Sequence, residues 1–335
     1  MREYLYVENT SGGDVTVISI PQHEVVGTIP ATIVGGHPDD VVASPDGRML
    51  FINRLEGQDV VALDARTEQV LFTVPLGGVP HHMTISRDGR FLYVPMFNGS
   101  VLKVIDLTRR EVVREIDIGL GAHATRLSPD GRRLYVGHIV HQAVMIIDLA
   151  RNEVVQTINF DRGVRPFAIS PDETTLYVQT SNMSGFHVVD IATGRIMQTV
   201  NMPTAPQTMP TSFPHTVDHG LALTRDGRRL LAAGALSGRI AIFSVPDMRV
   251  IADIPVGREP NWITLSDDER FAYVSNRVDD TISVISMDTF TEIKRLPAGD
   301  LPQRMTTARV DRLTEAQQDG AASTARSRGN VVDRH

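Results

Sequence analysis

The chain has no cysteine, two lysines and one tryptophan, and the first two shortages each exclude a class of chemistry. Without cysteine there is no thiol nucleophile, disulfide or thiolate metal site. The two lysines, Lys103 and Lys294, fall in segments expected to be strands facing outward, which argues against a Schiff-base mechanism. The sequence also lacks a Gly-x-Ser-x-Gly elbow and a phosphate-cradling glycine loop.

Positive charge is in the minority, and long apolar runs are missing. The net charge of −7 argues against nucleic acid or an anionic membrane as the main partner, because both attract a basic surface. No apolar run approaches the roughly 18 residues of a membrane helix. The first residues, Met1–Val7, lack the apolar core of a signal peptide and enter an expected strand at once. We therefore expect a cytoplasmic protein.

A four-residue turn recurs along the chain. Its first residue is Ser or Thr, its third is Asp, and its fourth is usually Gly, which suits a type I turn with a left-handed exit. The copies are Ser44–Gly47, Ser86–Gly89, Ser128–Gly131, Ser170–Glu173, Thr224–Gly227 and Ser266–Glu269. Their first residues are spaced by 42, 42, 42, 54 and 42 positions. Each copy is predicted to be a hairpin turn.

Strand-like runs repeat with the turns. A β-branched and aromatic run such as Leu92–Val94 follows each turn, and a third run such as Val104–Leu107 ends in Asp and an apolar residue. A fourth run, for example Glu111–Val113, completes the unit. Four short strands in about 40 residues are typical of a propeller blade.

The two ends of the chain together supply a further blade. The N-terminal segment provides three strands without a first strand, and Leu301–Thr307 matches the first strand of the other units. The predicted fold is therefore an all-β, seven-bladed propeller, with four antiparallel strands per blade and a last blade closed by the C-terminal strand. Such closure removes the exposed sheet edges. Residues 1–312 would form this single domain.

The repeated motifs, SPDG, LYV and VIDL, resemble the YVTN/YncE-like family of seven-bladed β-propellers over roughly residues 3–311. Propellers related to that family include surface-layer proteins, haem-d1 domains of nitrite reductase, lactonases, muconate cycloisomerases and metal-dependent lyases. The resemblance therefore implies a fold and leaves the activity to the residues of the site.

Seven equivalent positions precede the hairpin turns by five residues and should form a polar ring at one mouth of the channel. They are Asp39, His81, His123, Arg165, His219, Asn261 and Gln303. Three are histidine, the side chain most often used as a neutral metal ligand or proton shuttle. The alternative is a water-filled channel mouth without further chemistry. His82, the next residue on its strand, should point the other way.

Further polar residues are expected on the same face. Arg54 and His138 end second strands, and Asp218 and Arg304 lie beside the starts of first strands. The 54-residue step adds a proline-rich insertion at about residues 201–214, which would be either a lid over this face or an inert loop. Residues 313–335 have no strand pattern and are expected to be disordered.

The ring predicts an enzyme that uses a divalent metal ion. His81, His123 and His219, with Asp39 or Gln303, would bind the ion and leave positions open for catalysis. A small carboxylate-bearing substrate would be bound by Arg165, together with Arg54 or Arg304. Asn261 is expected to bind the same substrate. His138 or Asp218 would move the proton.

The expected reaction is an elimination, the opening or closing of a lactone, or a hydrolysis. One alternative is metal-free catalysis, with a ring histidine as acid or base beside Arg165. Another is a non-catalytic propeller that binds a protein or a tetrapyrrole, whose iron histidine can ligate.

Overall fold

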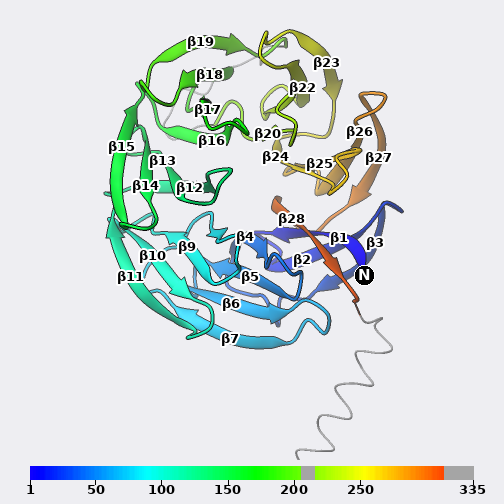
Figure 1. The fold of residues 1–335 in the computed structure, drawn as a ribbon. Coiled ribbons are helices and arrows are strands. Elements are labelled where there is room, and N and C mark those ends of the chain that lie inside the picture. Colours follow the sequence, from blue (N-terminus) through cyan, green and yellow to red (C-terminus); the bar gives the residue numbers. More distant parts are fainter. Residues whose placement is uncertain (205–215, 313–335) are drawn as a thin grey trace, which may run out of the picture.

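The computed structural model describes residues 1–204 and 216–312, and their strands form seven four-stranded antiparallel sheets around a central axis (Figure 1). The predicted seven-bladed propeller is confirmed. Most of the predicted insertion and all of the predicted tail lie outside the described residues.

Each blade is one sheet of four strands. From the first to the fourth strand of each blade, the sheets are β4 (Pro38–Ala43), β5 (Met49–Arg54), β6 (Asp59–Asp64) and β7 (Val70–Pro75); β8 (Thr84–Ile85), β9 (Phe91–Pro95), β10 (Val101–Asp106) and β11 (Glu111–Asp117); β12 (Ala122–Leu127), β13 (Arg133–His138), β14 (Ala143–Asp148) and β15 (Glu153–Asn159); β16 (Val164–Ile169), β17 (Thr175–Thr180), β18 (Gly185–Asp190) and β19 (Ile196–Asn201); β20 (Leu221–Leu223), β21 (Arg229–Gly234), β22 (Arg239–Ser244) and β23 (Val250–Pro255); β24 (Pro260–Leu265), β25 (Phe271–Asn276), β26 (Thr281–Ser286) and β27 (Thr291–Pro297); and β28 (Pro302–Val310), β1 (Arg2–Asn9), β2 (Asp14–Ile20) and β3 (Glu24–Ile29).

The hydrophobic core lies between the blades. Second and third strands are covered on both faces by neighbouring sheets, so their sequences read as continuous apolar runs. Leu50, Phe51 and Ile52 of β5, for example, are all fully buried. The fourth strands form the rim of the ring in Figure 1, and β7 there exposes Val70 and Leu71. In the part of the chain that is described, no helix is long and apolar enough to span a membrane.

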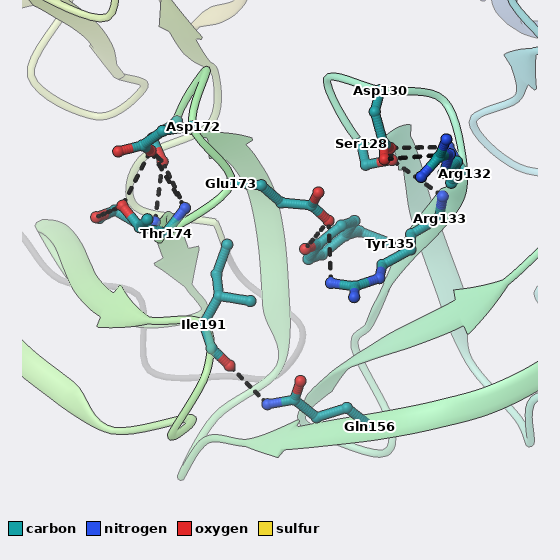
Figure 2. A network of polar contacts seen from close by, with 12 residues as sticks. Ser128, Asp130, Arg132, Arg133, Tyr135, Gln156, Asp172, Glu173, Thr174 and Ile191 are labelled. Carbon is teal, nitrogen blue, oxygen red and sulfur yellow. Dashed lines mark hydrogen bonds and ion pairs between the residues drawn. The ribbon is translucent and has the colours of Figure 1, made fainter.

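The recurrent turn is held by its own side chains. Ser128 donates a hydrogen bond from Oγ to Asp130 Oδ1 at 2.6 Å, and the same Oγ accepts the backbone N–H of Arg133 at 3.0 Å (Figure 2). Gly131 has a φ of 74°, which a glycine adopts without strain. All six turns contain this hydroxyl–carboxylate bond, at 2.5 to 2.7 Å. The repeated sequence therefore encodes a repeated turn.

Two turns replace the glycine with glutamate, at Glu173 and Glu269, whose φ values of 56° and 55° are unfavourable for a residue with a Cβ. Glu173 shows what such a residue can add. Its Oε1 accepts a hydrogen bond from the hydroxyl of Tyr135 at 2.7 Å and lies 3.4 Å from Arg133 Nη1 (Figure 2). Both partners belong to the preceding blade. The departure from the repeat therefore supplies a contact between two blades.

The ring is closed by the two ends of the chain, as predicted. β28 pairs antiparallel with β1, with Leu5 opposite Thr307. Beyond β28, the guanidinium of Arg312 binds Glu68 with a distance of 2.6 Å between Nε and Oε1, and Arg312 Nη1 donates to the carbonyl of Val26. Gly27 leaves the space for this guanidinium, since a Cβ there would lie 2.5 Å from Arg312 Nη2.

Candidate functional site

The first strands place the predicted ring residues around the central channel. Asp39 lies in β4, His123 in β12 and Arg165 in β16, while His81 and His219 lie just before β8 and β20. The rings of His81 and His123 have centroids 5.3 Å apart, and those of His123 and His219 are 5.8 Å apart. Histidines from three of the seven blades therefore meet at the channel.

His82 belongs to the same cluster, and the expectation that it points away was wrong. Its Nε2 lies 3.2 Å from His123 Nε2, so that one ring donates a hydrogen bond and the other accepts it. One ligand nitrogen from each of His81, His82 and His123 lies within 4.8 Å of the other two. His82, rather than His219, completes the most compact set of nitrogens.

An irregularity of the first strands explains the position of His82. The register against the second strand shifts at the corresponding position of five other blades, between Pro38 and Asp40 in β4 and between Ala122 and Ala124 in β12, for example. A bulge of this kind breaks the strict alternation of side chains between faces. In the His82 blade, regular pairing begins only at Thr84, and the N–H of His82 donates to the carbonyl of His123 in the next blade.

Asp39 lies beside two of the imidazoles. Its Oδ2 is 3.0 Å from His81 Nδ1 and 3.4 Å from His82 Nδ1, although neither ring N–H is aligned for a hydrogen bond. The side-chain amide of Asn53 fixes this part of the site, since it accepts the N–H of Asp39 and donates to the carbonyl of His81. Sequence reasoning missed Asn53, whose one signal is an amide within the apolar run of β5.

Burial keeps two of the clustered imidazoles, those of His82 and His123, neutral. Loss of water, together with the positive charges of Arg304 and neighbouring imidazoles, holds the pKa of His82 well below its ordinary value. Burial, His81 and Arg165 lower the pKa of His123 in the same way. A neutral imidazole keeps the lone pair that a metal ion requires.

The residues present fit a divalent metal ion. Nδ1 of His81, His82 and His123 and Oδ2 of Asp39 are buried, and none of these atoms has a hydrogen-bond partner among the described residues. Three imidazole nitrogens beside one carboxylate form a donor set typical of zinc and similar ions. An ion would satisfy buried polar atoms that otherwise cost free energy.

His219 has a different environment from the other three. Its Nδ1 lies 3.0 Å from the backbone carbonyl of Asn261. Because a carbonyl only accepts, Nδ1 carries the hydrogen and Nε2 keeps its lone pair. Burial and the charge of Arg165 lower the pKa of His219 well below the ordinary value. His219 is therefore a neutral proton acceptor beside the cluster.

Two arginines adjoin the histidines. Arg165 is buried, donates from Nε to Ser181 Oγ at 2.9 Å, and has a pKa lowered to about 10 by burial. The guanidinium carbon of Arg304 lies 3.5 Å from the ring centroid of Trp262. The rings of His82 and His219 both lie 6.4 Å from Trp262, so this single tryptophan forms the floor of the histidine site.

Four other predicted site residues make their contacts outside the histidine cluster. Arg54 forms an ion pair with Asp59 at 2.5 Å, and Gln303 donates from its amide to Thr10 Oγ1 at 2.7 Å. The ring of His138 faces that of His141 at 5.7 Å, and Asp218 accepts the N–H of Gly185 at 2.6 Å. The roles expected for these four residues stay predictions.

Fold and site together define a seven-bladed β-propeller that gathers its histidines at the central channel. The chain belongs to the lactonase family of seven-bladed β-propellers, because the family model described as "Lactonase, 7-bladed beta-propeller" matches residues 8–324. The narrower resemblance to YVTN/YncE-like propellers stays a prediction. No curated protein matches the chain in sequence.

Solved structures share the fold. The periplasmic gluconolactonase of Pseudomonas aeruginosa has a TM-score of 0.72 and 18% identity, over 92% of this chain and all of that one. A candidate 6-phosphogluconolactonase of Bacteroides fragilis has a TM-score of 0.74 and 16% identity, over 92% and 98%. Hydrazine synthase of Kuenenia stuttgartiensis has a TM-score of 0.72 and 22% identity, over 85% and 92%. At these identities the likeness concerns the fold alone.

Proposed function

We propose that the chain hydrolyses a small lactone at the histidine site, with a divalent metal ion bound by His81, His82 and His123. The observation that carries this proposal is the convergence of three ligand nitrogens within 4.8 Å. Membership of the lactonase family supports the substrate class. The product would be a hydroxy acid, which agrees with the carboxylate-bearing ligand expected from the sequence.

In this proposal each residue of the site has its own role in the reaction. His81, His82 and His123 would hold the ion, which would supply Lewis acidity for the lactone carbonyl and the attacking water. His219 accepts the proton of the attacking water at Nε2, the atom left with a lone pair by the Asn261 carbonyl. Arg165 stabilises the negative charge that develops as the ring C–O bond breaks. Asp39 balances positive charge beside His81 and His82.

The test is hydrolysis of γ- and δ-lactones, gluconolactone among them, by protein that is prepared metal-free and then reloaded with Zn²⁺, Mn²⁺ or Ca²⁺. At least one ion should restore activity. His82→Ala should lower kcat/KM about a hundredfold or more. Loss of a residue that only hydrogen-bonds to a metal ligand already lowers metal affinity or activity about 10- to 100-fold, and His82 would be a ligand itself. His37→Ala is the control, since His37 is exposed and pairs with Glu56. The absence of lactone hydrolysis under every metal condition would contradict the proposal.

A metal-free reaction is the second candidate, favoured by one contact. The Nε2–Nε2 distance of 3.2 Å between His82 and His123, with Asp39 behind His82, forms a short proton relay. Such a relay supports acid–base catalysis without an ion. Full activity after chelation, lost in His82→Ala, would favour this candidate over the first. The eliminations and isomerisations expected from the sequence stay predictions.

A further inference from the structure

A cavity next to Trp262 lies in the axial channel. Its volume is about 450 Å³, and every first strand from β4 to β28 contributes to its wall. Ser128 and Pro129, from a hairpin turn, also line it, so that it reaches the face that carries the turns. The ring histidines are not among its lining residues.

Positive charge exceeds negative charge along this cavity. Arg87, Arg126 and Arg304 line it, whereas Asp40 is the one carboxylate that lines it in the described part of the chain. The guanidinium carbons of Arg126 and Arg304 lie 5.6 and 3.5 Å from the centroid of the Trp262 ring. The carboxylate of Asp40 accepts the N–H of Met83 at 2.7 Å.

The guanidinium of Arg304 makes no direct ion pair among the described residues, although the carboxylates of Asp40 and Asp39 act on its charge without such contact. Its side chain is more than nine-tenths buried, and Nε and Nη2 have no hydrogen-bond partner among the described residues. Within residues 1–204 and 216–312, neither Arg304 nor Arg126 forms an ion pair with a carboxylate. Arg126 makes one long hydrogen bond of 3.3 Å, from Nη2 to the carbonyl of Leu221. A buried cation that makes no direct ion pair is costly, and a bound anion would reduce that cost.

We propose that the axial channel binds a small oxyanion, a carboxylate or a phosphate group, between Arg126 and Arg304 beneath Trp262. Guanidinium groups bind both kinds of anion through paired N–H donors. Entry is from the turn face, past Arg87, whose guanidinium already bridges to the carbonyl of Pro129 in the next blade. This site adjoins the histidine site at Trp262 and Arg304, and it does not depend on the chemistry of the histidines.

Trp262 makes the proposal measurable, because it is the one tryptophan of the chain and lies against both sites. Metal-free protein is titrated with sodium phosphate and, separately, with sodium succinate, at an ionic strength held constant with sodium chloride. The account predicts a saturable change in tryptophan fluorescence with at least one of the two anions. The tighter of the two identifies the kind of oxyanion.

The variants Arg126→Gln and Arg304→Gln should each weaken binding about tenfold or more, as expected for loss of a charged hydrogen-bond donor. Arg132→Gln is the control, because the side chain of Arg132 lies on the same face and is 87% exposed. Circular dichroism shows which variants fold. If Arg304→Gln does not fold, Arg126→Gln alone tests the proposal. A change that never saturates, or equal affinity in wild type and Arg126→Gln, would overturn the proposal. Neither result bears on lactone hydrolysis.

Discussion

At the scale of single residues, burial decides which imidazoles stay neutral. His138 is fully buried at the end of β13, and loss of water lowers its pKa to about 4 from an ordinary 6.5. His82, His123 and His219 are shifted in the same direction. The neutrality that suits a metal ligand therefore follows from the packing of the propeller, and it recurs at a histidine outside the cluster.

His138 predicts a pH dependence of stability. The unfolded chain binds a proton at His138 below pH 6.5, whereas the folded chain does so only below about pH 4, so the free energy of unfolding falls between these values. Below about pH 4 the loss of unfolding free energy that is due to His138 reaches about 3 kcal/mol. His138→Asn should flatten the curve over this window, as measured by urea unfolding at several pH values.

Val136→Ala is the control for this experiment, because Val136 is a fully buried, non-titrating residue of the same strand. It should lower the free energy of unfolding by a constant amount at every pH. If His138→Asn also runs parallel to the wild type, His138 does not resist protonation in the folded state.

At the scale of elements, the hairpin turn could be predicted from the sequence because its geometry depends on local side chains. Ser and Asp at fixed positions make the same hydrogen bonds wherever they recur. The bulge in the first strand could not be predicted in this way, since it depends on pairing with the second strand. The ring of His81, His123 and His219 was therefore found, while His82 was placed on the wrong face.

The turn predicts the outcome of two substitutions at one position. Ser128→Ala removes a hydroxyl that bonds Asp130 and Arg133, and should lower the free energy of unfolding by about 1 kcal/mol. Ser128→Thr should be nearly neutral, because Thr224 makes the same two bonds in its own turn. Equal losses in both variants, measured by denaturant unfolding, would show that backbone fit rather than the hydroxyl holds the turn.

At the scale of the whole molecule, stability depends on closing the ring. The 42-residue spacing predicted the number of blades and the pairing of both chain ends, because each blade needs a neighbour on either side. The Arg312–Glu68 pair was not predictable, since its residues are far apart in the sequence and belong to no repeat. The anion channel was missed for a related reason: Arg126 and Arg304 approach Trp262 only once the ring is closed.

The closing ion pair predicts a strong and non-additive effect. Both side chains are 7% exposed, so Arg312→Ala leaves Glu68 buried without its partner and should cost about 3 kcal/mol of stability. Glu68→Ala should cost a similar amount, and the double variant should cost clearly less than the sum. Additive losses in a double-mutant cycle would mean that the pair does not couple the C-terminal segment to the blade formed by β4–β7.

The central claim is that His81, His82 and His123 together bind one metal ion. The most direct measurement is zinc titration of metal-free protein by calorimetry, followed by X-ray absorption at the zinc edge. The account predicts one ion per chain with imidazole scattering, lost in His82→Ala and retained in His37→Ala. Absence of binding, or binding that is undiminished in His82→Ala, would contradict it.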